Sequence, residues 1–382
     1  MAGEALGPVL DSFEFEATAA VTVNAINLDG EYYAVAYRRS AASAHIKTYR
    51  IIPDGTISEI DTWEYTTDDS NYISIHHITS DLYVITATVN DGVTSLGRVK
   101  TVHISDTGII TKSIDDSADL VILEYACWVF PIAGNYFAII AGNSPYNHYI
   151  YTFTIVSGAG GITLIDSYLY SDIGYHVRAA GRVSNNVFFA VFGCDSQYKI
   201  YTLHVSNVGV ITTPYVALQA FAVVCGHGYL NLCQISTNIF AVSGYLALPY
   251  PAFIHTVQVN NDGTIEAATI DTLTFTGVKS VDGFICYTGS SSRFFIAYRG
   301  ADDDGFIDII DITDAGAISD DPGYAAFEFD AVYGSMPVVL PANGAWLPIF
   351  YIGPDGDGFL ASITFTAPAE GAHHEMIMKI GP

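Results

Sequence analysis

Positively charged residues are scarce in this chain. Only 14 of its 382 residues are Lys or Arg, against 40 Asp or Glu, and the formal net charge is −26. Nucleic acids and anionic membrane surfaces are bound by clusters of basic residues. The charge balance therefore argues against both as partners. Half of the residues are apolar and only 14% are charged, a composition that builds a sizeable core and excludes a disordered chain.

Long apolar runs and targeting signals are also missing. No stretch of about 18 uninterrupted apolar residues appears, so we expect no segment that inserts into a membrane. The first ten residues have neither a basic region nor a long apolar region, so we expect no signal peptide. Lys is sparse while Tyr, Thr, Ser and Gly are abundant, which favours an extracellular, surface or virion setting.

Cysteine is sparse as well, with five residues and no CxxC pair. A structural zinc site is therefore not expected, and a chain of this length does not need a disulfide framework. Cys194 and Cys225 fall in loops of neighbouring repeats and could pair in an oxidising compartment.

A repeat of about 52 residues runs through the sequence. Each copy has an aromatic residue or Leu followed by small and β-branched residues. A turn ending in Gly follows in phase, with an apolar residue two positions later. The copies of the first phrase begin at Tyr33, Tyr83, Phe137, Phe189, Phe240, Phe294 and Leu347. The turn glycines are Gly55, Gly108, Gly161, Gly209, Gly263 and Gly316.

Each repeat contains four strand-like runs rich in Val, Ile, Thr, Tyr and Phe, separated by Asn, Asp and Gly turns. No helical period persists for ten residues. Seven units of four antiparallel strands predict an all-β, seven-bladed β-propeller. We expect one propeller domain over residues 1–382. The segment from Gly7 to Phe15 matches the fourth strand of a blade, so we expect this N-terminal strand to close the ring.

The two ends of such a ring differ in sequence. The turns between the first and second strands are short and similar, whereas the connections at the opposite end are long and differ in every repeat. Binding residues gather on variable loops held by a rigid scaffold. We therefore expect a ligand on the long-loop face, near the axis, although many of these rings could simply pack between blades. The expected ligand-binding residues are Tyr72, Tyr125, Trp128, Tyr175, His176, His227, Tyr229 and Tyr333.

An acidic hairpin offers a candidate calcium site. Asp302, Asp304 and Asp308 match three positions of the pattern D-x-D-x-D-G-x-x-D, while Gly300 stands where the first Asp belongs. Calcium takes six to eight oxygen ligands, so carbonyls or water would have to replace the missing carboxylate. The alternative is a solvated acidic hairpin shaped by Asp-Gly turns.

Two further constellations concern catalysis and metals. Tyr175, His176, Arg178 and His227 lie near the start of neighbouring blades and could supply an acid, a base and a charge stabiliser. Packing between blades is the alternative, and the charge of −26 disfavours anionic polymers. His76, His77, His176 and His227 could bind zinc or iron only around the axis. His76 and His77 are adjacent on a strand, so their side chains point to opposite sides.

Other catalytic signals fail. The sequence has no GxSxG nucleophile elbow and no Gly-rich phosphate loop at a strand-to-helix junction.

The segments 297–307 and 350–360 share a phrase of the form Tyr-x-Gly, acidic turn, Asp-Gly-Phe. They resemble repeats of uncharacterised secreted or surface-displayed microbial and archaeal β-propeller proteins. They also resemble the FG-GAP propellers loosely, without the Phe-Gly…Gly-Ala-Pro signature. The resemblance implies a binding or surface-display role and names no reaction.

Three functions follow from these patterns. The first is a non-enzymatic recognition propeller that binds a glycan or a protein partner on its long-loop face. The second is a polysaccharide lyase or hydrolase with its His, Tyr and Arg centre at an axial pocket. The third is a structural subunit of a surface or virion assembly.

Overall fold

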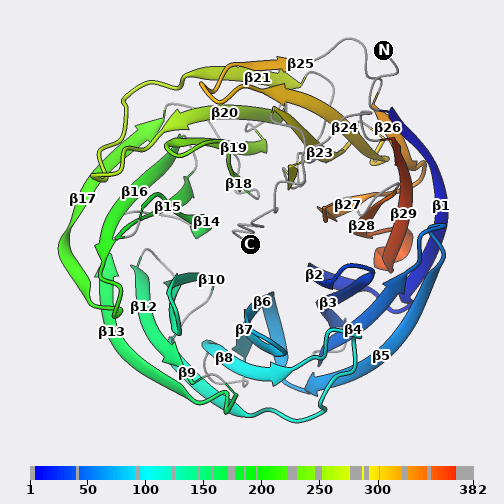
Figure 1. Cartoon of the computed structure of the whole chain (residues 1–382), viewed down its shortest axis with the longest axis horizontal. Helices are drawn as coiled ribbons and strands as arrows, with labels where there is room; N and C mark the ends of the chain where they lie inside the picture. Colours follow the sequence, from blue (N-terminus) through cyan, green and yellow to red (C-terminus); the bar gives the residue numbers. More distant parts are fainter. Residues whose placement is uncertain are drawn as a thin grey trace.

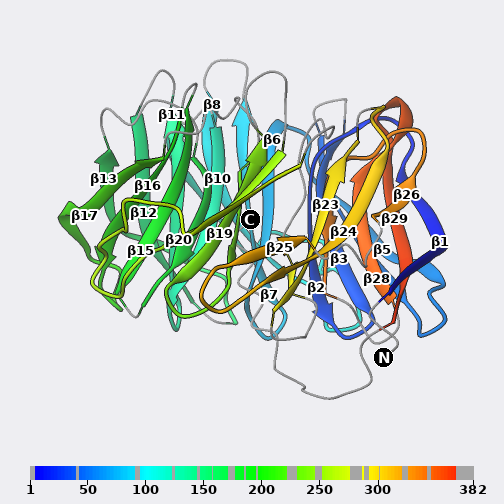
Figure 2. The same cartoon turned by 90° about the horizontal axis from the view of Figure 1, so that it is seen from above.

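Seven antiparallel sheets circle a central axis in the computed structural model. Figure 1, viewed down the ring, shows the first strands near the centre and the fourth strands along the circumference. In Figure 2 the strands run between the two ends of the ring. The structure describes residues 5–39, 43–90, 95–122, 125–143, 147–156, 158–170, 177–184, 186–194, 197–221, 230–245, 252–275, 286–287, 292–300, 302–320, 326–341 and 346–366. The predicted fold is confirmed.

The blades follow the chain, and we number them by their first strand. Blade 1 holds β2 (Ala20–Asp29), β3 (Tyr32–Arg39), β4 (Ser43–Ile51) and β5 (Ile57–Thr66). Blade 2 holds β6 (Asp69–Thr79), β7 (Leu82–Asn90), β8 (Ser95–His103) and β9 (Asp116–Ile122). Blade 3 holds β10 (Tyr125–Ala133), β11 (Tyr136–Asn143), β12 (Asn147–Ile155) and β13 (Ile162–Tyr170). Blade 4 holds β14 (Val177–Arg182), β15 (Val187–Cys194), β16 (Gln197–Val205) and β17 (Ile211–Phe221).

Blade 5 holds β18 (Asn231–Gln234), β19 (Ile239–Tyr245), β20 (Ala252–Gln258) and β21 (Asp271–Phe275). Blade 6 holds β22 (Cys286–Tyr287), β23 (Arg293–Arg299), β24 (Gly305–Ile312), β25 (Ile318–Asp320) and β26 (Phe327–Asp330), the last two both pairing with β24. Blade 7 holds β27 (Ser335–Val339), β28 (Trp346–Ile352), β29 (Gly358–Thr366) and β1 (Ala5–Glu16). A 3-10 turn, η1 (Pro354–Gly356), joins β28 and β29.

The N-terminal strand closes the ring, as predicted. β1 pairs antiparallel with β29, so the first residues of the chain supply the outermost strand of the last blade. Figure 1 shows β1 at the circumference beside β29. Among the described residues, no helix is long and apolar enough to cross a membrane.

The core lies between the blades. Because side chains alternate along a strand, Tyr33 and Tyr37 of β3 pack toward blade 7, and Ala34 and Ala36 pack toward blade 2. Each seam between two blades is therefore filled from both sides.

A hydroxyl clasp joins successive blades. In six blades a Thr or Ser on the third strand donates a hydrogen bond to the carbonyl of a turn glycine in the next blade, at 2.5 to 2.8 Å. The six pairs are Thr48–Gly108, Thr101–Gly160, Thr152–Gly209, Thr202–Gly263, Thr256–Gly316 and Ser362–Gly55. The turns need glycine because φ is positive, at 88° for Gly55, and because a Cβ there would lie 2.4 Å from Leu10.

A carboxylate reinforces most of these clasps. An Asp on the fourth strand accepts a hydrogen bond from the backbone N–H two residues after the turn glycine, at 2.7 to 3.0 Å. The five pairs are Asp11–Ile57, Asp61–Ile110, Asp116–Ile162, Asp166–Ile211 and Asp271–Ile318. The turn glycine that repeats in the sequence thus forms the hydrogen bonds that fix the position of each blade relative to the preceding one.

Two blades lack part of the clasp: blade 4 lacks the carboxylate, and blade 6 lacks the hydroxyl. Blade 4 has Ala217 at the Asp position, where it pairs with Thr202 as Asp61 pairs with Thr48. Blade 6 has Ile309 at the Thr position. Its neighbour, blade 7, has no turn between the third and fourth strands that could accept a hydroxyl, because β29 and β1 come from opposite ends of the sequence.

Two details of the predicted repeat are corrected. The turn glycine of blade 3 is Gly160, since its carbonyl receives the Thr101 hydroxyl, and Gly161 follows it. In blade 4 the residue equivalent to Tyr33 is Phe188, because Phe189 pairs with the clasp residue Thr202. Both offsets arise because the sequence has two like residues in a row, Gly160-Gly161 and Phe188-Phe189, so the pattern alone does not choose between them.

Candidate functional site: the loop face

The two ends of the ring are distinct. We call the end with the β2–β3 and β4–β5 turns the turn face, and the opposite end the loop face. The clasps use the turn face in a repeating manner, since their glycines lie in turns between the third and fourth strands. The polar contacts at the loop face are different in each blade.

Bulged first strands mark the loop face. Thr22, Tyr72 and Met336 occupy equivalent positions in β2, β6 and β27, each at a break in register with the second strand. All three have positive φ, 52°, 51° and 49°. This conformation is unfavourable for non-glycine residues, and bulges of this kind often re-aim side chains beside binding sites.

Arginine side chains cross the seams at this face. Arg38 at the end of β3 pairs with Asp69 at 2.9 Å and also contacts Asn71, both on β6 of the next blade. Arg98 of β8 bridges Asp68 at 2.7 Å and Asp119 at 2.6 Å. These guanidinium groups are paired with carboxylates and hold the rim in place, and the Arg38 and Arg98 side chains stay 22% and 20% exposed.

The loop after β26 brings one predicted residue to the same rim. Tyr333 is partly buried against the core, and its hydroxyl lies 3.4 Å from Nη1 of Arg299. The Arg299 guanidinium lies 5.9 Å from the centre of the Tyr333 ring and 3.5 Å from Asp303. An aromatic ring, a cation and a carboxylate thus meet at the seam of blades 6 and 7.

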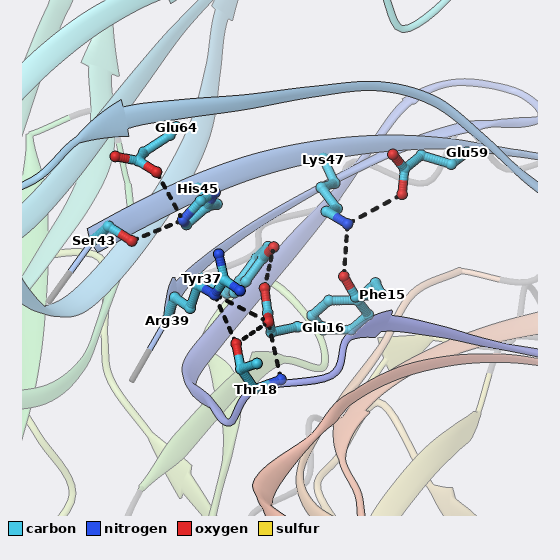
Figure 3. A network of polar contacts seen from close by, with 10 residues as sticks. All are labelled: Phe15, Glu16, Thr18, Tyr37, Arg39, Ser43, His45, Lys47, Glu59 and Glu64. Carbon is cyan, nitrogen blue, oxygen red and sulfur yellow. Dashed lines mark hydrogen bonds and ion pairs between the residues drawn. The ribbon is translucent and has the colours of Figure 1, made fainter. Parts of the chain in front are cut away.

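A closing network joins β1 to blade 1 (Figure 3). Glu16 is 8% exposed and accepts hydrogen bonds from the Thr18 N–H and hydroxyl and from the Tyr37 hydroxyl at 3.1 Å. Arg39 lies 3.3 Å from the same carboxylate. Burial alone raises the pKa of Glu16, but these donors and Arg39 outweigh it and hold the pKa below its usual value.

A second group of polar contacts, beside the first, contains Ser43, His45 and Glu64 (Figure 3), and the His45 ring stacks on the Tyr37 ring. Nε2 of His45 lies 2.8 Å from the Ser43 hydroxyl and 3.7 Å from Glu64, so one ring nitrogen faces both groups. A nucleophile, base and orienting acid need the two different ring nitrogens. Burial lowers the pKa of His45 despite Glu64. We interpret these contacts as structural, because Ser43 and His45 lie on β4 and Glu64 lies on β5 of the same blade.

A small cavity lies beneath the rim at the seam of blades 1 and 2. Its volume is about 10 Å³, and it is lined by Tyr65, Ser70, Arg98 and neighbouring aliphatic side chains. The buried Tyr65 hydroxyl has no hydrogen-bond partner among the described residues. A cavity of this size holds about one water molecule, so it can hydrate Tyr65 but cannot take a substrate.

The predicted ligand-binding and catalytic residues divide into three groups. Tyr72 and Tyr333 lie at the loop face as predicted. Tyr72 lies on β6 at the seam of blades 1 and 2, and Tyr333 lies at the seam of blades 6 and 7. Tyr125, Trp128 and Arg178 lie on the first strands β10 and β14, with only their backbone described. Tyr175, His176, His227 and Tyr229 lie outside the described residues, as does Cys225 and with it the proposed pairing to Cys194.

The strand order places His76 and His77, considered above as metal ligands, away from the loop face. They lie toward the opposite end of β6, where Nε2 of His77 is 2.8 Å from the Ser80 carbonyl in the β6–β7 turn. The sequence itself indicates this position, because His76 and His77 come only two or three residues before the Thr79-Ser80-Asp81 turn.

The acidic hairpin of blade 6 is formed. Gly300 donates its N–H to the Asp304 carbonyl at 2.8 Å, and Asp308 on β24 is 8% exposed. Across the part of the chain that the structure describes, no three His, Cys, Asp or Glu side chains converge as they would around a metal ion. The calcium site stays a prediction.

No protein family model and no curated protein matches this sequence. The resemblance to secreted or surface propeller repeats therefore stays a prediction.

Solved structures do resemble the fold. A putative 6-phosphogluconolactonase from Bacteroides fragilis has a TM-score of 0.58 and 12% identity over 80% of this chain and 84% of its own. The periplasmic gluconolactonase PpgL of Pseudomonas aeruginosa has a TM-score of 0.56 and 10% identity over 81% and 85%. Sqt1 from Chaetomium thermophilum has a TM-score of 0.53 and 13% identity over 91% and 83%. At such low identity the likeness supports the seven-bladed propeller fold alone.

Proposed function

We propose that this chain is a recognition module that binds a glycan or a protein partner on its loop face and catalyses no reaction. The carrying observation is the division between the two faces. The turn face is built from one clasp repeated around the ring, whereas the loop face carries a different set of side chains on each blade. A repeated contact serves assembly of the ring, and non-repeating side chains on a rigid scaffold serve recognition.

The chemistry of the loop face suits sugars and protein side chains. Tyr72 and Tyr333 supply aromatic faces, and Arg38 and Arg299 supply hydrogen-bond donors beside them. Aromatic rings stack on apolar sugar faces and protein side chains at low entropic cost. The composition supports an extracellular or surface setting.

The alternative is a lyase or hydrolase that uses Tyr175, His176, Arg178 and His227. Two of the similar structures are named as lactonases, so turnover is part of the test.

The test compares matched variants on one strand. Arg299 and Arg293 stand at opposite ends of β23, each side chain is 26% exposed, and each pairs with an Asp. We expect the wild-type protein to bind on a glycan array or to capture a surface protein of its native source. Arg299→Ala and Tyr72→Ala should weaken that binding about tenfold, a loss typical of a contact residue. Arg293→Ala on the turn face should leave it unchanged.

Two results would overturn the proposal. One is binding that Arg293→Ala weakens as much as Arg299→Ala does. The other is an absence of binding together with turnover of polysaccharides or sugar lactones that His176→Ala and His227→Ala abolish.

A further inference from the structure

Charge is distributed unevenly around the ring. Residues 125–261 contain three acids, Asp166, Asp172 and Asp195, and three bases, Arg178, Arg182 and Lys199. The remaining sequence holds 37 acids and 11 bases, so it carries the entire formal charge of −26. Blades 3 and 4 and most of blade 5 lie in the neutral stretch, which is the green sector of Figure 1.

The outer strands of this sector also expose apolar side chains. Leu164 and Leu169 on β13 are 56% and 43% exposed. Strand register shows that they occupy the positions of Glu59 and Glu64 in blade 1, since Leu164 pairs with Phe153 as Glu59 pairs with Tyr49. The fold therefore accepts carboxylates at both positions, and the leucines are not required by the blade.

The neighbouring blade shows the same exchange. Leu218 on β17 is 40% exposed and stands where blade 1 has Thr62. In the β16–β17 turn of the same blade, Val208 and Val210 are 55% and 51% exposed.

Blade 1 has Asp54 and Thr56 at the positions of these two valines. The Asp54 carboxylate caps its turn by accepting the Thr56 N–H, and in blade 4 the Ser206 hydroxyl accepts the Val210 N–H instead. The turn is thus satisfied without the valines, which leaves their exposure without a role in the isolated blade.

These residues lie on neighbouring outer strands of the ring. Leu164 and Leu169 lie on β13, Leu218 lies on the adjacent β17, and the blade 4 turn reaches β13, because a Cβ on Gly209 would come within 3.5 Å of Ile165. We call Leu164, Leu169, Val208, Val210 and Leu218 the apolar flank. Other exposed apolar residues, such as Leu10, belong to the clasp, because Leu10 packs on the next blade's turn glycine.

We propose that the apolar flank is the contact surface between two copies of this chain. Two chains that each carry −26 repel one another wherever charged sectors meet. The flank lies within the long neutral stretch of residues 125–261, so two copies meet there with little repulsion while covering exposed apolar side chains.

The dimensions fit a homodimer. Two adjacent outer strands, each about 30 Å long and each presenting a face about 10 Å wide, offer roughly 600 Å², close to the roughly 800 Å² per partner of a stable interface. Pro214 lies within β17 and has no N–H to donate. The contact is therefore made by side chains in an isologous pairing of flank with flank, rather than by extension of the sheet.

The experiment measures mass by sedimentation equilibrium over two decades of concentration. We expect the wild-type chain, of 41.1 kDa, to sediment as a dimer that dissociates on dilution. The double variant Leu164→Glu, Leu169→Glu copies the side chains of blade 1, so the fold should survive. It should raise the dimer dissociation constant at least about 100-fold, because carboxylates would be buried without partners.

Two further samples sharpen the result. The control Ser58→Glu, Thr62→Glu adds the same charge on β5, away from the flank, and should leave the dimer intact. An equimolar mixture of the Glu double variant with Leu164→Lys, Leu169→Lys should restore the dimer, because acid would then meet base. A monomeric wild-type chain would overturn the proposal, as would a dimer that persists in the Glu variant or a flank that captures only a different protein.

Discussion

At the scale of single residues, Asp308 is a buried acid in an unfavourable place. It stands where blades 1 and 2 carry Lys47 and Lys100, whose ammonium groups bond carbonyls of the preceding blade. Burial raises the pKa of Asp308 to about 6, and the charge of Asp320 adds to this, while the Ile309 N–H opposes it. Ionisation of Asp308 at neutral pH therefore opposes folding.

We expect Asp308→Asn to stabilise the protein at pH 7.5. Between the ordinary pKa of 3.8 and about 6 the folded chain binds this proton more tightly than the unfolded chain, so stability falls as pH rises through that window. The variant removes this loss, and the unfolding free energy should rise by about 1 to 2 kcal/mol at pH 7.5, where 1 pKa unit is about 1.4 kcal/mol. The gain should vanish near pH 4.

Chemical denaturation at both pH values measures this effect. Added calcium provides the contrast: if Asp308 is a calcium ligand, calcium will stabilise the wild-type chain and not the variant. A variant less stable than the wild-type chain at both pH values would contradict the prediction.

A buried histidine has the opposite dependence on pH. His255 is 4% exposed, and its Nδ1 lies 3.1 Å from the Tyr198 hydroxyl. Burial lowers the pKa of His255 to about 4, below the ordinary value of 6.5. Between these values the unfolded chain binds the proton and the folded chain does not, so stability is lost as pH falls from about 6.5 toward 4.

We expect His255→Gln to flatten this acid dependence. The drop in unfolding free energy between pH 7 and pH 4.5 should shrink by about 2 kcal/mol, whatever the variant costs at pH 7. Denaturation curves at several pH values give the slope. His77→Gln, at an exposed position, serves as the control and should keep the wild-type slope. An unchanged slope in His255→Gln would show that His255 does not govern acid stability.

At the scale of strands and turns, the carboxylate that blade 4 lacks leads to a prediction about Ala217. The Ala217 N–H bonds the Thr202 hydroxyl at 3.0 Å, just as the Asp271 N–H bonds Thr256 at 3.1 Å. Ala217→Asp should therefore place a carboxylate where the other blades use one to receive a backbone N–H. We expect a gain of about 1 kcal/mol, typical of a hydrogen bond to a charged group after desolvation. Ala217→Ser is the control, and an equal or negative effect of Ala217→Asp would count against the clasp.

The sequence predicted this element scale well because the repeat multiplies each local signal. Seven copies of four strand patterns identify the blades, and the extra fourth-strand pattern around Phe15 identifies the closing strand. The clasp was not predicted, because its hydroxyl and its glycine lie in different repeats, about 60 residues apart in sequence. A search for Thr and Asp in phase with the turn glycines could have found it.

The loop face was less predictable for a physical reason. Its contacts join residues that differ from blade to blade, so no repeat reveals them. Tyr72 and Tyr333 were placed correctly from the order of strands, but the pairing of Glu16 with Tyr37 and Arg39 depends on ring closure, which brings residues of β1 beside β3. Pairings of this kind follow only from coordinates.

At the scale of the whole molecule, the ring depends on one strand supplied from the far end of the chain. β1 buries Phe15, whose ring contacts Tyr37 at 5.1 Å and Phe350 at 6.2 Å, so it fills the seam between blades 7 and 1. The Phe15 carbonyl also receives the Lys47 ammonium at 2.7 Å. Without β1, the edge of β29 and this seam lie open.

Removal of residues 1–16 should therefore destabilise blades 7 and 1 together. We expect the melting temperature to fall, and we expect a synthetic peptide of residues 1–16 to restore it in trans, because strand pairing and apolar burial need no covalent link. A peptide with Phe15→Ala should rescue less well, since truncating a buried aromatic ring costs about 3 to 5 kcal/mol. Thermal melts against peptide concentration test this. If the truncated chain melted like the full chain, the ring would close without its N-terminal strand. That result would contradict the closing role of β1 and of the contacts of Glu16.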